Sequence, residues 1–391
     1  MSLDQHERAA GAFTSVADLD VDAFIGLCER DVDAESVPTA SEIVRKVPVY
    51  TASALRSAAA ADRRAIMAEL NGCFLDGPGA LAVRDAMDRD VVDAASAAYR
   101  ELIDEEAAAG RAAGDHFAAP GTNERLWNSF QKLAERSPST FVAYFANPVL
   151  DLVCESWLGP GYRMTAQVNV VHPGGAPQRP HRDYHLGFLS DDEAARYPLP
   201  MHRASALLTL QGAVAHTDMA VESGPTRLLP FSQRYDLGFL AYRHPAFEDY
   251  FTEHFVQVPL RKGDLLFFNP ALFHAAGDNR TASVVRTANL LQVSSAFGKP
   301  METIDTAGII LRCFAELQAL HEQESLGDEL EAALTMVADG YPFPGNLDST
   351  PPTGGLAPPS QRDVLRRALD EEWSFDELST ALATQQAARS A

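Results

Sequence analysis

The sequence is short of cysteine, of long apolar runs and of basic residues, and each shortage argues against a class of protein. Its 391 residues include four widely separated cysteines without a CxxC pair, which argues against a zinc ribbon or a thioredoxin-type motif. No run reaches the roughly 18 apolar residues of a membrane span, and the first residues lack the basic and apolar stretches of a secretory signal. We therefore expect a cytoplasmic protein without a membrane partner, in which Cys28, Cys73, Cys154 and Cys313 are buried thiols.

The shortage of basic residues gives the chain a strongly negative charge. It has 32 Lys and Arg against 54 Asp and Glu, a net charge of −22. Binding to nucleic acid or to an anionic membrane requires basic side chains, so both partners are disfavoured. Residues 160–300 are nevertheless close to neutral, with 13 Lys and Arg and 12 Asp and Glu. The acidity therefore belongs to the rest of the chain and says little about what the central region binds.

Three segments follow one another along the chain. Residues 1–47 are polar and acidic and predict an N-terminal arm, 48–300 predict a helical flank plus a catalytic core, and 301–391 predict C-terminal helices packed on the same domain. The last segment includes a stretch rich in proline and glycine, 340–360. Apolar residues at helical spacing mark the flanking helices. The most regular of these patterns cover residues 53–158, with 88–109 the clearest part, then 303–320, 328–338 and the end of the chain from about 361.

The pattern changes at Tyr162, where short β-rich runs separated by turn residues begin. No long helical patterns lie between these runs, which favours an antiparallel barrel or jelly roll over a doubly wound parallel sheet. We expect a mixed α and β fold, a double-stranded β-helix (a cupin-like jelly roll) flanked by N- and C-terminal helices. The expected strands cover residues 162–171, 204–214, 227–229, 255–260, 265–268 and 283–294.

The densest polar cluster is the sequence HRDYH at 181–185. Residues two apart share one face of a strand, so His181 and Asp183 can point to the same place. The third ligand of a metal site should then come from a distant strand, and His274 follows an apolar, strand-like run. Two histidines and one carboxylate leave open positions on iron(II), the arrangement that non-haem oxygenases use. An anionic 2-oxo acid suits such a metal, and Arg286, twelve residues after His274, can bind its far carboxylate.

Four sequence blocks in this order resemble the phytanoyl-CoA dioxygenase family of iron(II)/2-oxoglutarate-dependent oxygenases. They are PGGAPQRPHRDYH, ESGPTRLLPFSQ, GDLLFFNPALFHAAGDNRT and SVVRTANLLQ, all within residues 160–296. The resemblance implies a jelly roll that holds iron(II) at His181, Asp183 and His274, with Arg286 on the 5-carboxylate of 2-oxoglutarate. The implied reaction consumes 2-oxoglutarate and O2, releases succinate and CO2, and hydroxylates a C–H bond of a small-molecule substrate.

The chain departs from the family pattern two residues after His274. Ala276 stands there in place of the serine or threonine that often helps to hold the cosubstrate. Thr281 or Gln167 would have to replace that interaction. Halogenating relatives have a small residue at the position of the carboxylate ligand, so Asp183 disfavours halogenation.

Two other functions remain open at this point. The motif at 181–185 could be a complete metal site with His185 in place of His274, which would suit a hydrolase or an isomerase. A cupin-like binding protein without turnover is the other, although the triad and Arg286 argue against it. We expect a monomer or a homodimer. The side chains expected to contact the substrate are Gln178, Tyr184, His185 and Trp127.

Overall fold

The structure is a computed structural model, and it describes residues 11–110, 123–348, 351 and 354–389. The first ten residues of the expected N-terminal arm and part of the proline- and glycine-rich stretch lie outside the described residues. Within the described part, the chain forms two compact units. The first comprises residues 11–86, 123–125 and 169–290, and the second comprises 87–110, 126–168 and the described residues from 291 onward.

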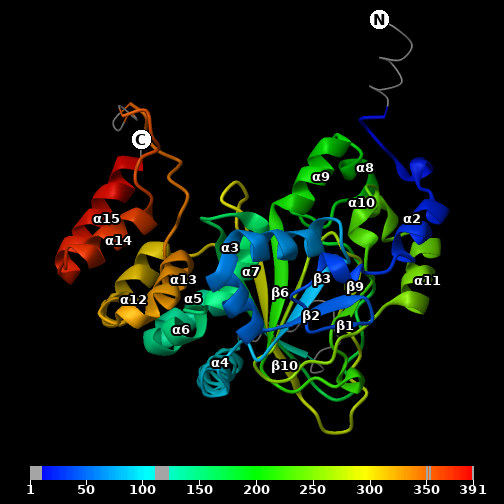
Figure 1. Ribbon diagram of the computed structural model, residues 1–391, viewed down its shortest axis with the longest axis horizontal. Coiled ribbons are helices and arrows are strands. Elements are labelled where there is room, and N and C mark those ends of the chain that lie inside the picture. Colours follow the sequence, from blue (N-terminus) through cyan, green and yellow to red (C-terminus); the bar gives the residue numbers. More distant parts are fainter. Residues whose placement is uncertain (1–10, 111–122, 349–350, 352–353, 390–391) are drawn as a thin grey trace, which may run out of the picture. The chain divides into compact units, whose positions relative to one another are not determined.

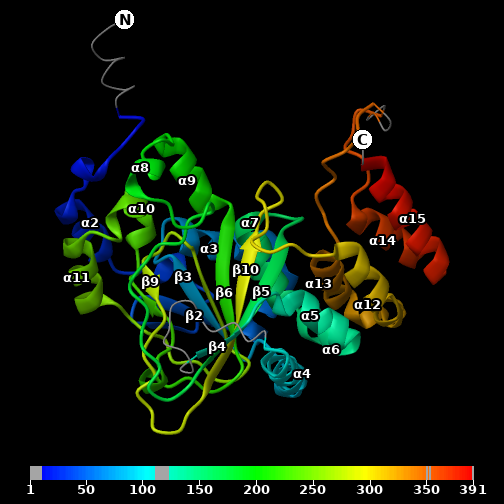
Figure 2. The same ribbon diagram turned by 180° about the vertical axis from the view of Figure 1, so that it is seen from behind.

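Two sheets form the β part of the fold. The larger has the strand order β1-β2-β3-β8-β6-β10-β5-β4, and β7 pairs with β9 in the smaller one. Figure 2 shows β6, β10 and β5 side by side, and the last two run on from one unit into the other. The strands are β1 (Glu42–Val44), β2 (Val47–Thr51), β3 (Ala80–Arg84), β4 (Asn123–Leu126), β5 (Arg163–Val171), β6 (Thr209–Ala215), β7 (Arg227–Leu228), β8 (Leu265–Phe268), β9 (His274–Ala275) and β10 (Arg286–Ser294).

The first unit packs apolar side chains on both sides of its strands. Alternate residues of β2, β3, β6 and β8 form one core cluster, in which Val49, Ala82 and Leu266 are fully or almost fully buried. The helix α3 packs on β2 and β3 (Figure 1). Phe24 of α2 contacts Phe247 of α11 edge-on, with ring centroids 4.9 Å apart. The helices of this unit are α2 (Val21–Cys28), α3 (Ala52–Leu75), α8 (Asp191–Ala194), α9 (Leu199–Leu207), α10 (Gly238–Ala241) and α11 (Pro245–His254), with 3₁₀ turns η1 (Val16–Asp18), η2 (Ala34–Ser36), η3 (Val221–Ser223) and η4 (Ser232–Arg234).

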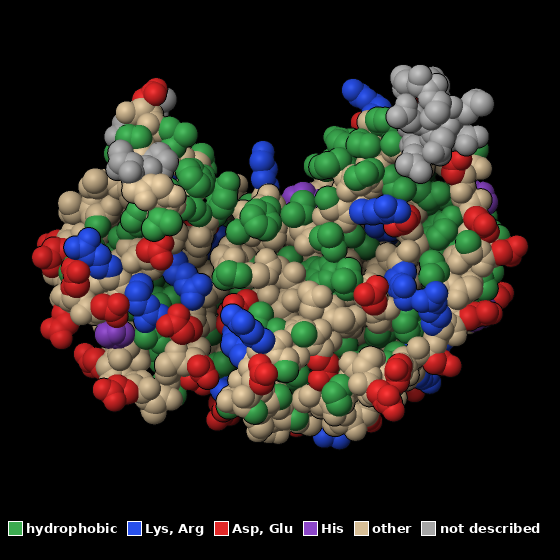
Figure 3. All heavy atoms as spheres, turned by 45° about the horizontal axis from the view of Figure 1, so that its top comes forward, with side chains coloured by type: hydrophobic (Ala, Val, Ile, Leu, Met, Phe, Trp, Pro, Cys, Tyr) green, Lys and Arg blue, Asp and Glu red, His purple; other side chains and the backbone are tan. Residues whose placement is uncertain are grey.

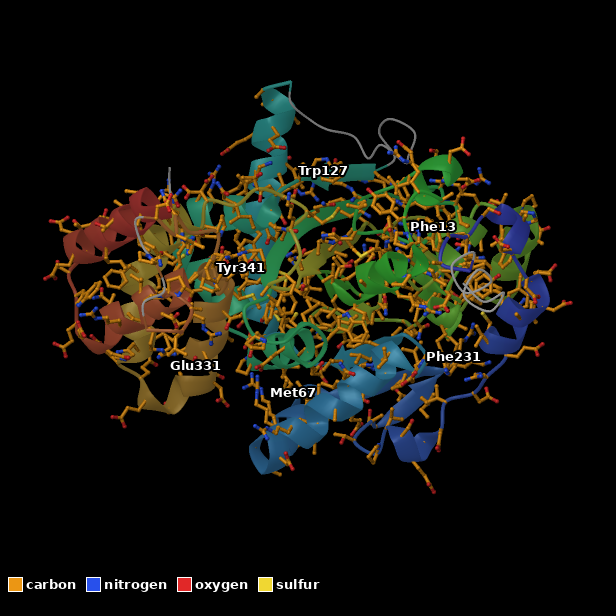
Figure 4. All side chains as sticks on the ribbon, turned by 90° about the horizontal axis from the view of Figure 1, so that it is seen from above. Phe13, Met67, Trp127, Phe231, Glu331 and Tyr341 are labelled. Carbon is orange, nitrogen blue, oxygen red and sulfur yellow. The ribbon has the colours of Figure 1, made fainter. Side chains whose placement is uncertain are left out.

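The second unit is mostly helical. Asn147 caps α7 by accepting hydrogen bonds from two backbone N–H groups at 3.0 Å, and Ser360 caps α14 in a capping box. Glu331 of α13, labelled in Figure 4, accepts hydrogen bonds from two arginines of α14, Arg362 and Arg366. The helices are α4 (Arg89–Ala108), α5 (Ser129–Arg136), α6 (Pro138–Phe145), α7 (Pro148–Leu158), α12 (Thr306–His321), α13 (Gly327–Val337), α14 (Gln361–Asp370) and α15 (Phe375–Arg389), with the 3₁₀ turn η5 (Glu324–Leu326).

The expected mixed α and β class with a two-sheet β core is confirmed, and several expected elements differ in detail. The first half of the expected strand 204–214 is the end of α9, and β6 begins only at Thr209. Residues 255–260 form isolated bridges rather than a strand. The expected helical region 53–158 contains β3, a parallel partner of β2. The expected last helix is divided into α14 and α15. The three-segment division of the chain remains a prediction.

The four cysteines are free and buried, as expected. Burial raises the pKa of the Cys28 and Cys313 thiols to about 12 and that of Cys73 to about 11. These side chains are therefore neutral at physiological pH and act as small apolar groups. Within the described residues, no helix has both the length and the hydrophobicity needed to cross a membrane.

Candidate metal centre

A pair of backbone hydrogen bonds joins the two histidines of the candidate site. The N–H groups of His181 and His274 each donate to the carbonyl of the other at 2.9 Å. The N–H of Asp183 donates to the carbonyl of Pro270 at 3.0 Å. His181 forms a single β-bridge and lies outside any regular strand, which corrects the expectation of a strand face. The three side chains converge because these hydrogen bonds fix two separate stretches of backbone against each other.

Both imidazole rings are oriented by backbone carbonyls. The Nδ1 of His181 lies 3.0 Å from the carbonyl oxygen of Arg179, and the Nδ1 of His274 lies 2.8 Å from that of Leu272. A carbonyl oxygen can only accept, so in the neutral form of each ring Nδ1 carries the hydrogen and Nε2 keeps its lone pair. This is the tautomer of a metal-ligating histidine whose other nitrogen is bonded to the protein. Desolvation by burial, followed by the neighbouring His274, lowers the pKa of His181, which favours the neutral ligand form.

Asp183 lies between the two Nε2 atoms. Its Oδ1 is 3.8 Å from Nε2 of His181 and its Oδ2 is 3.7 Å from Nε2 of His274. The Nε2 of Gln211, a buried residue of β6, donates a hydrogen bond to Oδ2. Burial by itself would raise the pKa of the Asp183 carboxyl, but the two imidazoles, in their protonated form, and the hydrogen bond from Gln211 hold it well below its usual range. Gln211 was not expected from the sequence, because its only signal is that of a polar residue inside an apolar strand.

The three side chains fit a divalent metal. Their ligand atoms all lie within 4.8 Å of one another, and among the described residues they form the one group of three or more His, Cys, Asp and Glu side chains arranged in this way. Two imidazole nitrogens and one carboxylate suit iron(II) and leave further coordination positions open. His185 is outside the group, so the described structure does not form the site that the hydrolase or isomerase hypothesis requires.

Arg286 lies at the start of β10 and is buried, with a relative exposure of 6%. Its Nη1 donates to the carbonyls of Ser223 at 2.9 Å and Gly277 at 3.1 Å. Among the described residues it has no carboxylate at ion-pair distance; Asp278 acts on it only at longer range. Burial lowers the pKa of its guanidinium to about 10, which still leaves it charged at neutral pH. A buried, uncompensated cation is costly, and an anionic ligand would offset that cost.

Glycines allow the backbone to approach Arg286 closely. Gly224 has a φ of +77°, and a Cβ there would lie 2.3 Å from the carbonyl oxygen of Asp278. A Cβ on Gly277 would lie 2.7 Å from the carbonyl oxygen of Gly224. The carbonyls of Ser223 and Gly277, which accept hydrogen bonds from Arg286, therefore lie where two stretches of backbone approach closely. This close approach requires glycine at positions 224 and 277. Segment 222–225, the start of one of the blocks of the family resemblance, thus contributes backbone around the arginine.

Several other expected site residues form hydrogen bonds with protein groups. The Oε1 of Gln178 accepts from the N–H of Ala276 at 3.2 Å, and the Thr281 hydroxyl donates to Oδ1 of Asn279 at 2.7 Å within a turn. The Tyr184 hydroxyl lies 2.7 Å from Nδ1 of His202 on α9. The N–H of His185 donates to the hydroxyl of Ser205 at 3.0 Å on the same helix. Contacts of these residues with cosubstrate or substrate remain predictions.

Gln167 and Trp127 belong to the second unit. Gln167 is a buried residue of β5, and Trp127, labelled in Figure 4, directly follows β4. The described site, by contrast, lies wholly in the first unit. The roles expected for these two side chains therefore remain predictions.

A His-Asp-His group and a buried arginine in a fold with a large mixed sheet define a candidate non-haem iron oxygenase. Comparison with known proteins agrees with this class. A family model described as "Phytanoyl-CoA dioxygenase (PhyH)" matches residues 75–288, which is more than half of the chain. The chain belongs to the phytanoyl-CoA dioxygenase family of iron(II)/2-oxoglutarate-dependent oxygenases. Iron(II), 2-oxoglutarate and O2, expected from the sequence, are the cofactor and cosubstrates of this family.

Two fungal proteins are similar in sequence. The chain is 30% identical over 125 residues to "Dioxygenase trt7" of Aspergillus terreus, which covers 32% of this chain and 38% of that protein. It is 28% identical over 144 residues to "Dioxygenase andF" of Emericella variicolor, covering 36% of this chain and 45% of that protein. The matched segments thus span less than half of the length of these curated relatives.

Solved structures of lower sequence identity also align. The epimerase SnoN from nogalamycin biosynthesis aligns at a TM-score of 0.41 and 20% identity, over 59% of this chain and 84% of that chain. AviO1 from Streptomyces viridochromogenes aligns at a TM-score of 0.42 and 14% identity, over 61% of this chain and 97% of that chain. At these scores the alignments add no argument about function.

Proposed function

We propose that this protein is an iron(II)- and 2-oxoglutarate-dependent dioxygenase that hydroxylates a C–H bond of a small-molecule substrate. The observation that carries the proposal is the convergence of two Nε2 lone pairs and one carboxylate at His181, His274 and Asp183. Membership of the dioxygenase family supports the same reaction class. Bound iron(II) would supply the redox chemistry that converts 2-oxoglutarate to succinate and CO2 and inserts oxygen into the substrate.

Each side chain would have a separate role in binding the metal or the cosubstrate. His181 and His274 would hold the metal through Nε2, with their rings kept in place by the carbonyls of Arg179 and Leu272. Asp183 would provide the anionic ligand, and Gln211 would fix the orientation of its carboxylate. Arg286 would bind the far carboxylate of 2-oxoglutarate and thereby orient the cosubstrate. The retained carboxylate at position 183 favours hydroxylation over halogenation.

Four free, buried thiols support the expectation of a reducing compartment, and hence of the cytoplasm. The expected monomer or homodimer is checked by light scattering on the metal-loaded protein.

The proposal is tested by loading the protein with iron(II) under nitrogen and then adding O2 with and without 2-oxoglutarate. We expect succinate to form in proportion to 2-oxoglutarate consumed, slowly without substrate and faster with one. Absence of any iron-dependent succinate formation, with or without a panel of small molecules, would reject the dioxygenase. Products that keep their oxygen content while 2-oxoglutarate is consumed would reject hydroxylation and retain the class.

A further inference from the structure

A pocket opens directly beside His181 in the first unit. Its volume is about 480 Å³, which falls in the ordinary range for small-molecule sites. The side chains that matter for recognition are Gln178, His181, Phe188, Tyr242, Arg179 and Arg243; two prolines complete the lining. The lining therefore contains two arginines and two aromatic rings, and none of its residues is acidic.

The two arginines differ in how strongly they are already neutralised. Arg179 makes a two-point ion pair with Glu248, with contacts of 3.0 and 2.6 Å. Two contacts of Arg243 with described residues use Nη1, which donates to the carbonyl of Leu189 at 2.5 Å and lies 3.5 Å from Oδ1 of Asp191. The Asp191 side chain is 51% exposed, and such surface pairs contribute little. Neither contact occupies the Nε–Nη2 edge, along which a guanidinium binds a carboxylate bidentately.

Aromatic rings connect Arg243 to the metal ligand. The guanidinium carbon of Arg243 lies 4.8 Å from the centroid of the Tyr242 ring, which holds its plane in place. The Phe188 ring lies 6.4 Å from Tyr242 and meets the His181 ring edge-on at 5.9 Å. Phe188 is 50% exposed, so it offers apolar surface that a ligand would cover. Figure 3 shows hydrophobic side chains gathered over the upper part of the first unit.

We propose that this pocket binds the substrate, and that the substrate is a flat, apolar molecule with one carboxylate. Its ring system would lie against Phe188 and Tyr242, and its carboxylate would pair with the Nε–Nη2 edge of Arg243. The reactive carbon would thereby be held near the metal side of His181. This inference rests on the proposed function for the reaction, but the binding that it describes can be measured without turnover.

The test uses two matched probes, 2-naphthoate and its neutral analogue 2-naphthamide. Both are titrated under nitrogen into the full-length protein loaded with Mn(II), with and without 2-oxoglutarate, by calorimetry. We expect 2-naphthoate to bind about tenfold more tightly than 2-naphthamide, as for one charged hydrogen-bonded contact. Mn(II) should also accelerate the proton relaxation of the bound naphthoate, because the probe lies beside the metal. Equal affinities, or relaxation that Mn(II) leaves unchanged, would overturn the proposal.

Variants assign the preference to particular residues. Arg243→Gln should remove the tenfold preference, whereas Arg203→Gln should keep it, because Arg203 is an exposed arginine paired with Asp236 outside the pocket. Phe188→Ala should weaken both probes to the same extent. If Arg243→Gln still prefers 2-naphthoate to 2-naphthamide, Arg243 does not bind the carboxylate and the proposal is wrong. Tight binding of 2-naphthyl phosphate but not of 2-naphthoate would show that the pocket takes a phosphate and would overturn the proposed carboxylate. If the protein forms succinate but does not prefer 2-naphthoate, only the proposed substrate pocket is wrong. If it prefers 2-naphthoate but forms no succinate, the proposed dioxygenase activity is wrong.

Discussion

Both units bury arginines, and two of these, Arg163 of the second unit and Arg286 of the first, differ in the groups that they contact. In the second unit, Arg163 of β5 has a side chain only 8% exposed and forms an ion pair with Asp339 at 3.3 Å. In the first unit, Arg286 of β10 is equally buried but has only backbone carbonyls as close partners among the described residues. Burial is the main cause that lowers the pKa of both guanidinium groups.

The difference distinguishes an arginine whose counter-charge lies in the chain from one whose counter-charge we propose to be a ligand. Arg163 has its counter-charge within the chain, so its ion pair contributes to the folded state alone. Arg286 keeps its charge in a buried position beside the segment that follows His274. A ligand carboxylate bound there would compensate the charge of the guanidinium. A cation that folding leaves uncompensated is a stronger indication of an anionic ligand than burial alone.

The largest expected effect is on the metal. His274→Ala removes one of three ligands, so iron(II) affinity should fall by more than the 10- to 100-fold typical of outer-sphere changes, and succinate formation should fall to background. Metal content after equilibrium dialysis measures the first and succinate assay the second. The matched variant His185→Ala should keep its iron. Loss of iron from His185→Ala with retention in His274→Ala would restore the alternative H-x-D-x-H site.

The comparison of the two arginines predicts opposite phenotypes. Arg286→Gln should raise the Kd for 2-oxoglutarate by up to about 100-fold while iron binding is kept, because charge-assisted hydrogen bonds are lost. Arg163→Gln should leave that Kd unchanged and lower the free energy of unfolding by about 1–3 kcal/mol, since Asp339 is only partly buried. Calorimetry and urea unfolding measure the two quantities. If both variants bind 2-oxoglutarate with equal affinity, Arg286 has no role in cosubstrate binding that Arg163 lacks.

A smaller effect is expected at the residue that orients the carboxylate ligand. Gln211→Leu removes the hydrogen bond to Oδ2 of Asp183 and should weaken iron(II) binding by about tenfold. The control is Gln233→Leu, which removes another glutamine of the first unit that donates to the carbonyl of Gly77. The control should lower stability and leave iron affinity unchanged. If both variants lose iron equally, the contact with Asp183 has no specific role.

The smallest effect is expected on the surface of the second unit. Glu331→Ala removes the acceptor of Arg362 and Arg366, yet all three side chains are at least a quarter exposed. The free energy of unfolding should therefore fall by less than about 1 kcal/mol. Urea unfolding measures this change. A loss of several kcal/mol would show that the network between α13 and α14 is as important as the buried pair at Arg163.

Much of the fold was predictable because local patterns agree with tertiary packing. The helix expected at 88–109 is α4, one residue shorter at each end. The strand expected at 162–171 is β5, which begins one residue later, and the strand expected at 265–268 is β8 with the same bounds. The failures have tertiary causes. Residues 204–208 combine apolar and small side chains that suit either element, and packing makes them the end of α9. The strand β3 could not be separated from its helical surroundings because its run of five residues is short.

The sequence by itself determined the class of chemistry. The order of His181, Asp183, His274 and Arg286 within four blocks indicated an iron(II)/2-oxoglutarate oxygenase, since those residue types in that order rarely occur together by chance. Only the tertiary structure decided which histidine completes the group, which backbone carbonyl the Nδ1 of each ring contacts, and that Gln211 bonds to Asp183. Those facts depend on backbone contacts between segments about 90 residues apart, and such contacts leave no local pattern in the sequence.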